Sequence, residues 1–171
     1  MKFYHYIKLA IFIAFATLIF VYNKELLEYL HYLVSSLMIA FGVENIIVKI
    51  IKDKKKCFKD LWFAYGFAEL LIGLVMIISI RDYTSICVIW GVWSILREAI
   101  ELHEIASGEL KGIPAILSGI ESIVAIVFSV MLIMEPGEHH AHVHVYLLIP
   151  ELLVSGFVPV LDELLEKFKK E

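Results

Sequence analysis

The sequence has little cysteine, proline or charge, and it lacks the common catalytic motifs. Of its 171 residues, two are cysteine and four are proline, and charged residues make up 20%. Two cysteines, Cys57 and Cys87, exclude a framework of several disulfides. The sequence contains no phosphate-binding loop, dinucleotide fingerprint or nucleophile elbow, and "HEIAS" at 103–107 has a serine where a zinc-protease motif needs its second histidine. We therefore expect no enzyme and no resident cofactor.

Apolar residues are in large excess. They make up 60% of the chain, with a mean hydropathy of +0.82, whereas a soluble domain has roughly 45–50%. Since a bilayer core of about 30 Å is crossed by about 20 helical residues, six apolar runs are candidate spans. They fall at 6–22, 29–51, 61–80, 83–102, 112–134 and 143–165. The sequence predicts an all-α, polytopic membrane protein with six transmembrane helices in a single domain, 1–171.

The positive charges predict the orientation of these spans. Lysines gather in the turn at 49–60 and in the tail at 166–171, whereas the alternate turns hold only Lys24 and Arg81. By the positive-inside rule, both termini are expected on the cytoplasmic side of the cytoplasmic (inner) membrane. The Lys52–Lys59 loop could bind anionic lipid, although topogenic charge is the favoured explanation. No nucleic-acid partner is expected, because this short basic loop is not part of a recognisable reading module.

An internal repeat is suggested by aligning the second helix of each predicted pair. Gly42, Glu98 and Gly156 then fall in register, and Gly66 aligns with Gly119 in the first helices. This pattern predicts three tandem helical hairpins, at about 6–51, 61–102 and 112–165. The outer faces of such hairpins are apolar enough to allow self-association as well as contact with the lipid bilayer.

Several motifs in these repeats resemble those of a known family. They are "AYGFAELLIGL" (64–74), "IWGVW" (89–93), "LSGIESI" (117–123), "MEP" (134–136) and "LVSGF" (153–157). In this respect the chain resembles the HdeD-like acid-resistance membrane proteins. The resemblance implies a six-span, non-enzymatic protein linked to acid or envelope stress, and it supplies no catalytic residues. Glu98, where the family pattern has a glycine, and the histidine-rich turn depart from that pattern.

Carboxylates interrupt the apolar spans at Glu44, Glu69, Glu98, Glu121 and Glu151. A charge near the bilayer centre costs at least about 2.5 kcal/mol, so these groups should face protein or water, or be protonated. One interpretation is structural: each acid hydrogen-bonds inside the bundle, with Asn45, Ser118 and Ser122 as possible partners. The other is functional: Glu69 and Glu121, both near mid-membrane, line a shared cavity that carries protons or other cations.

Arg97 has a local explanation. It lies four residues before Glu101 and next to Glu98, which predicts a salt-bridge cluster on one helix face. Because it lies near the cytoplasmic end of its span, its side chain is expected to reach toward the headgroups.

The stretch "MEPGEHHAHVHVY" at 134–146 holds four of the seven histidines, His139, His140, His142 and His144. We expect it to form an outward-facing turn, with the last helix beginning near Val143. It is either a solvated loop, a pH-responsive patch or a divalent-metal site. The last requires the helix to extend backward, so that His140 and His144 share a face.

Three functions follow from these features. The first is a non-enzymatic, HdeD-like membrane protein in acid or envelope stress. The second is a small transporter or channel for protons, cations or metal ions that uses the intramembrane glutamates. The third is an extracytoplasmic sensor of pH or metal.

Overall fold

The chain forms a bundle of helices. The computed structural model describes residues 2–52, 61–108 and 110–168, and within these ranges all regular structure is helical. The helices are α1 (Lys2–Glu28), α2 (Leu30–Lys52), α3 (Leu61–Ser79), α4 (Tyr83–Ser107), α5 (Ile113–Met134) and α6 (Glu138–Phe168). The predicted all-α class is confirmed. The loop proposed to bind anionic lipid, with Cys57, lies outside the described residues.

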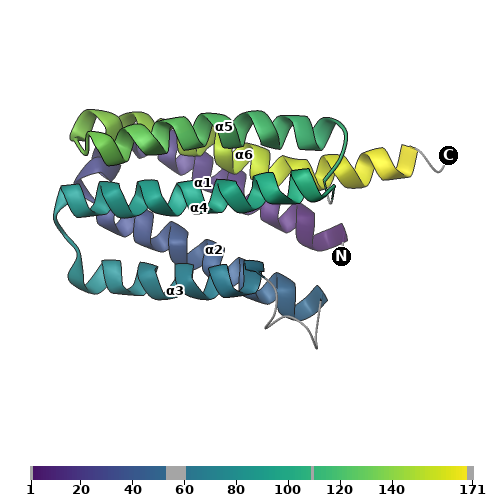
Figure 1. Cartoon of the computed structure of the whole chain (residues 1–171), viewed down its shortest axis with the longest axis horizontal. Coiled ribbons are helices and arrows are strands. Elements are labelled where there is room, and N and C mark those ends of the chain that lie inside the picture. Colours follow the sequence, from purple (N-terminus) through teal and green to yellow (C-terminus); the bar gives the residue numbers. More distant parts are fainter. Residues whose placement is uncertain (1, 53–60, 109, 169–171) are drawn as a thin grey trace.

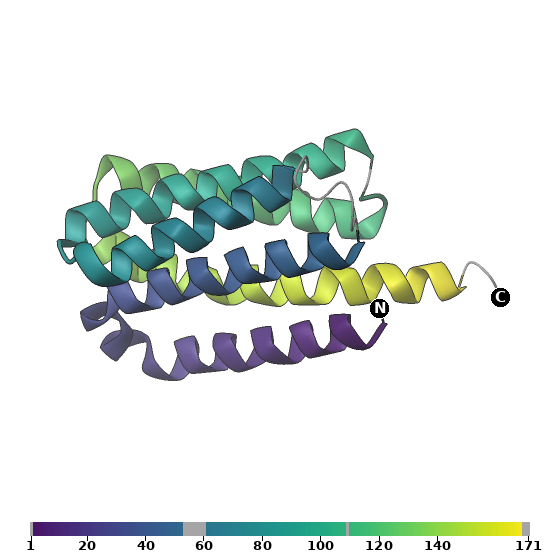
Figure 2. The ribbon, with the colours of Figure 1, turned by 90° about the horizontal axis from the view of Figure 1, so that it is seen from below.

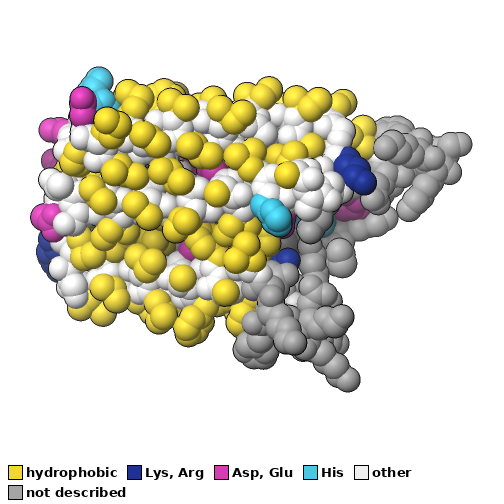
Figure 3. All heavy atoms as spheres, in the orientation of Figure 1, with side chains coloured by type: hydrophobic (Ala, Val, Ile, Leu, Met, Phe, Trp, Pro, Cys, Tyr) yellow, Lys and Arg dark blue, Asp and Glu magenta, His cyan; other side chains and the backbone are white. Residues whose placement is uncertain are grey.

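Four of these helices, α2, α3, α5 and α6, are long and apolar enough to cross a membrane. The apolar part of α1 is shorter, at Lys8–Tyr22, and α4 carries Arg97, Glu98 and Glu101. Figure 3 shows hydrophobic side chains over the lateral face, with most charged side chains gathered at the two ends. The protein therefore has the composition and surface of a multi-pass membrane protein.

The helices run side by side, with their connections at two ends of the bundle (Figures 1 and 2). The turns at 29, 80–82 and 135–137 lie at one end, and the connection at 108–112 lies at the other, with the N-terminus. The closest neighbours are α2 with α3, α4 with α5, and α1 with α6, whereas α1 and α2, like α3 and α4, touch little. The closest packing thus joins helices of different predicted hairpins: the first with the second, the second with the third, and the first with the third.

Small residues account for the closest of these contacts. A Cβ added to Gly42 of α2 would lie 2.6 Å from the carbonyl oxygen of Gly66 in α3. Likewise, a Cβ added to Gly91 of α4 would lie 2.8 Å from the carbonyl oxygen of Ser129 in α5. Gly156 of α6 lies against Leu9 of α1, whose Cα would be 3.3 Å from such a Cβ. Helices in lipid associate through this close backbone approach, because burial of apolar surface gains little there.

Local chemistry sets several helix ends. Asp82 caps α4: its side chain accepts a hydrogen bond from the backbone N–H of Ser85 at 2.9 Å, and hydrogen bonds from the Ser85 side chain and backbone hold the pKa of Asp82 below its usual range. At the other end of α4, Gly108 adopts the left-handed conformation (φ 77°) that glycine tolerates.

Two helix boundaries differ from those expected. The first is in α1, which was expected to end at residue 22 but continues to Glu28, with a kink at Tyr22 (φ −110°, ψ 23°) before the turn at residue 29. The second is in α6, which begins at Glu138 and not near Val143. An acidic residue in the first turn favours this earlier start, because it faces the positive end of the helix dipole. The four histidines are therefore helical and do not form a loop.

We expect Gly42→Ala to lower the free energy of unfolding by roughly 1–3 kcal/mol, because the new methyl group meets backbone atoms of α3. Gly119→Ala is the matched control, since its Cβ would meet only Ile105 Cδ1, at 3.7 Å, and helix propensity should then raise stability by up to about 1 kcal/mol. SDS titration in detergent micelles measures both. Equal effects of the two substitutions would contradict the close α2–α3 contact.

Candidate functional site

Glu69 is held in a complete hydrogen-bond network. Its side chain on α3 is 1% exposed, and its two carboxylate oxygens accept hydrogen bonds from Asn45 Nδ2 of α2 at 2.8 Å and from Trp93 Nε1 of α4 at 2.7 Å. The hydroxyl of Tyr65 donates to the backbone carbonyl of Trp93 at 2.9 Å. This network links three helices, and Asn45 is confirmed as a hydrogen-bond partner of one of the predicted acids. The structural interpretation fits Glu69.

Arg97 is buried and does not reach the headgroups. Its guanidinium carbon lies 3.6 Å from the centroid of the Phe41 ring of α2 and 6.0 Å from that of Trp93. The predicted salt bridge with Glu101 is not formed among the described residues, because the Arg97 side chain packs on these aromatic faces and does not run along its own helix. Its charge instead acts on several carboxylates at longer range: Glu151, Glu69, Glu98 and Glu101.

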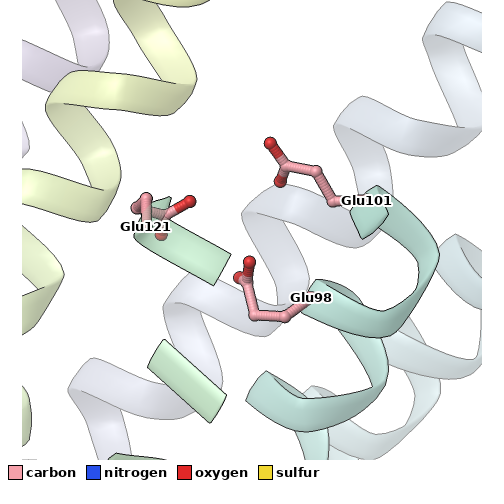
Figure 4. Close-up of side chains that lie close together, drawn as sticks. All are labelled: Glu98, Glu101 and Glu121. Carbon is pink, nitrogen blue, oxygen red and sulfur yellow. The ribbon is translucent and has the colours of Figure 1, made fainter. Parts of the chain in front are cut away.

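Three carboxylates converge between α4 and α5 (Figure 4). One oxygen from each of Glu98, Glu101 and Glu121 lies within 4.8 Å of the others, and this is the one group of three or more metal-ligating side chains that close together in the described part of the chain. Both oxygens of Glu121 are buried without a hydrogen-bond partner among the described residues. Glu98 is 1% exposed and interacts with the side chain of Ser122 on α5. We call these three residues the acidic cluster.

The acidic cluster has the geometry to hold a cation. A hard divalent ion binds oxygens at roughly 2.0–2.6 Å and so keeps its ligands roughly 4–5 Å apart or closer. A proton shared between neighbouring carboxylates is the alternative, because like charges this close oppose ionisation of every member. In either case the carboxylates need a cation, since Arg97 does not form an ion pair with them.

A cavity of about 280 Å³ lies between α5 and α6. Its polar wall consists of Glu121, His144 and Glu151, and the rest is apolar: Leu117, Ile120, Val124, Ala125, Leu147, Pro150 and Val154. Pro150 has no N–H to donate, so the carbonyl of Tyr146 loses its helical partner beside this cavity. Glu121 belongs both to this cavity and to the acidic cluster. The cavity therefore leads to the cluster.

The structure separates the two acids expected to share a cavity. Glu69 does not line the cavity described above, and Glu151 occupies the second acidic position beside Glu121. Glu69 faces α2 and α4, whereas Glu121 faces α4 and α6, so the cavity described above is not one that the two acids share. Glu44, the remaining predicted acid, forms an ion pair of 2.6 Å with Lys8 of α1. It belongs neither to the acidic cluster nor to the lining of the cavity.

The four histidines do not come together as a set. His144 is 2% exposed and lies edge-on to Trp90, with ring centroids 4.5 Å apart. His139 is exposed, and His140 Nδ1 lies 3.0 Å from the carbonyl oxygen of Glu135. His142 stacks near Tyr146, with centroids 5.0 Å apart. Metal binding or pH sensing at this turn stays a prediction.

Sequence reasoning missed three participants. Glu101 was assigned to Arg97, although its position three residues after Glu98 already places both acids on one helix face. Trp93 was not singled out as a donor to Glu69, and His144 was grouped with the turn and not with the bundle interior. No local signal could have found the last two, because their partners lie on other helices.

We expect Trp93→Phe to destabilise the protein more than Trp90→Phe, by roughly 1 kcal/mol of unfolding free energy. Both indoles are buried, but only that of Trp93 donates to Glu69; Trp90 Nε1 has no partner in the described residues. The pair of variants therefore isolates the hydrogen bond from the loss of ring volume. SDS titration measures the difference, and equal losses would remove the structural assignment of Glu69.

Comparison with known proteins finds no relative of this chain. No family model, no curated protein and no solved structure matches it. The resemblance to HdeD-like proteins rests on the motifs quoted above, and the site is interpreted from its own geometry and chemistry.

Proposed function

We propose that this chain is a small integral membrane carrier that exchanges cations, protons in the first place, at the acidic cluster of Glu98, Glu101 and Glu121. The observation that carries the proposal is the convergence of these three carboxylates inside an apolar bundle, where that of Glu121 has no hydrogen-bond partner among the described residues. Structural acids do not need this arrangement, as Glu69 demonstrates with its two donors.

The charge balance of the interior supports cation uptake. Four carboxylates interact electrostatically with the single buried guanidinium, that of Arg97: Glu69, Glu98, Glu101 and Glu151. Glu121 lies beside Glu98 and Glu101 and is the fifth carboxylate of this region. An ionised carboxylate without compensation is expensive in this setting, at about 2.5 kcal/mol or more. The excess negative charge must therefore be neutralised by bound protons or by another cation. A group that must bind a cation and has an open cavity beside it can also release that cation.

Six spans in three hairpins, with cytoplasmic termini, are the topology that we propose for this carrier. The two helices with a weaker apolar signal, α1 and α4, have 27 and 25 residues, which at 1.5 Å per residue is roughly 40 Å and 38 Å, enough for a crossing. In α4 the charged residues Arg97 and Glu98 are buried by neighbouring helices and so avoid lipid. The HdeD-like resemblance suggests that such a protein acts in acid or envelope stress.

The crossing by α4 can be tested with Arg81→Cys and Lys111→Cys, each in a background in which Cys57 and Cys87 are replaced by serine. Both positions are exposed; Arg81 precedes the N-terminus of α4, and Lys111 follows its C-terminus. We expect a membrane-impermeant maleimide to label the first variant in intact cells and the second only after permeabilisation. Labelling of both from the same side would contradict the six-span topology.

Cation exchange is tested in proteoliposomes that contain a trapped pH-sensitive dye. We expect proton flux along an imposed gradient, and Glu98→Gln or Glu121→Gln should lower its rate by about tenfold or more, since each removes a site that the proton occupies. Glu44→Gln is the control, because its ion pair with Lys8 lies outside the acidic cluster and flux should continue.

A parallel series with external Zn²⁺ or Mn²⁺ and a trapped metal indicator distinguishes the cations. Flux of a metal ion that depends on the same two glutamates would identify a metal carrier. Absence of flux of both protons and metal ions, with wild-type protein that elutes as a folded species, would overturn the proposed function.

A further inference from the structure

We infer that the cavity between α5 and α6 is a binding site for a small hydrophobic ammonium ion, which enters from the lipid side and pairs with Glu121. This inference adds a second ligand to the proposed carrier and rests on that function for transport, but the binding itself can be measured separately. It rests on three features of the cavity: its walls, its open side and its charge.

The walls of the cavity are mostly apolar and suit the apolar part of a ligand. Seven of the ten lining residues are aliphatic side chains or proline. The volume of about 280 Å³ is near the lower end of small-molecule sites, which run from roughly 300 to 1,000 Å³. A ligand of the size of one aromatic ring with a substituted nitrogen suits this space better than a large amphiphile.

The open side of the cavity faces the lateral surface of the bundle. Leu117, Ile120, Val124 and Pro150 line it and are themselves exposed, and they lie on helices with the length and composition of membrane spans. A ligand that partitions into the bilayer can therefore reach the cavity without crossing a polar surface. This favours a hydrophobic cation over a hydrated metal ion at this position.

The polar wall selects positive charge. Glu121 contributes a carboxylate without a hydrogen-bond partner among the described residues, and His144, which is 2% exposed, contributes an unpartnered Nδ1. Glu151, the second acid of the cavity, interacts electrostatically with the positive charge of Arg97. The titratable groups around Glu121 are thus Glu98 and Glu101 from α4, and His144 and Glu151 from α6, with Arg97 as the nearby cation.

Binding of the ammonium ion should release a proton. If the Glu121 carboxyl is protonated in the empty site, the cation replaces that proton, which leaves to water, and the carboxylate pairs with the ammonium. No bond other than the O–H bond breaks, and no oxidant or further reactant is needed. Since Glu121 also belongs to the acidic cluster, the ammonium ion and the cluster proton compete for one group.

The test uses radiolabelled benzyltrimethylammonium and the full-length protein in a neutral maltoside detergent. We expect saturable binding, release of one proton for each ion bound in weakly buffered solution, and affinity that is at least about tenfold lower in Glu121→Gln. Neopentylbenzene, the neutral isostere in which carbon replaces nitrogen, should compete at least about tenfold more weakly. Glu44→Gln should bind as the wild type does.

A second variant guards against loss of folding. Val124 is 40% exposed and lines the cavity, so Val124→Trp can fill the cavity without disturbing the buried core. It should abolish ammonium binding, while SDS titration shows the same unfolding transition as for the wild type. Equal competition by the neutral isostere, or binding that survives both Glu121→Gln and Val124→Trp, would overturn the inference. Ammonium binding without any cation flux would instead refute the carrier and leave the binding site standing.

Discussion

The charged residues of α4 impose the constraint on which the rest of the bundle depends. This helix carries Arg97, Glu98 and Glu101 within a bundle whose other long helices are mostly apolar, and charges in such a bundle are costly unless they are enclosed by protein. The bundle meets the constraint by surrounding α4, so that Arg97 is buried against Phe41 of α2 and Glu98 against α5. The polar groups of α2, α3 and α5 face α4 or one another: Glu69 accepts hydrogen bonds from Asn45 and Trp93, and Glu121 lies beside Glu98.

Hydrogen-bond satisfaction divides the buried acids into two kinds. Glu69 receives hydrogen bonds from two donors on two other helices, and so it stabilises the packing of α2, α3 and α4. Glu98 is as buried as Glu69 and interacts with the side chain of Ser122, whereas Glu121 is half-buried and its oxygens have no hydrogen-bond partner among the described residues. A buried acid without partners must be neutralised, and that requirement makes it a site for a cation. The same residue type thus has different surroundings within one bundle, and the donors around each acid decide whether it needs a cation.

Glu121 connects the two proposals. It lies at the meeting point of the acidic cluster and the cavity, so a proton and an organic cation would compete for one carboxylate. Competition of this kind couples the movement of two cations without a large conformational signal, because each ligand can bind only after the other has left. The unpaired carbonyl of Tyr146, freed by Pro150, adds a fixed dipole next to the cavity.

The sequence by itself determined the helical class, the positions of the apolar runs and the presence of acids within them. These are local properties, since run length and periodicity depend on neighbouring residues. It also placed Asn45 among the possible partners of an acid. Only the tertiary structure decided that Glu69 accepts a hydrogen bond from Trp93 and that Glu121 lies near Glu98 and Glu151. It also decided that His144 is buried against Trp90 inside the bundle. The physical reason is that helix neighbours are chosen by close backbone approach, as at Gly42 and Gly66, between segments whose register no local pattern encodes.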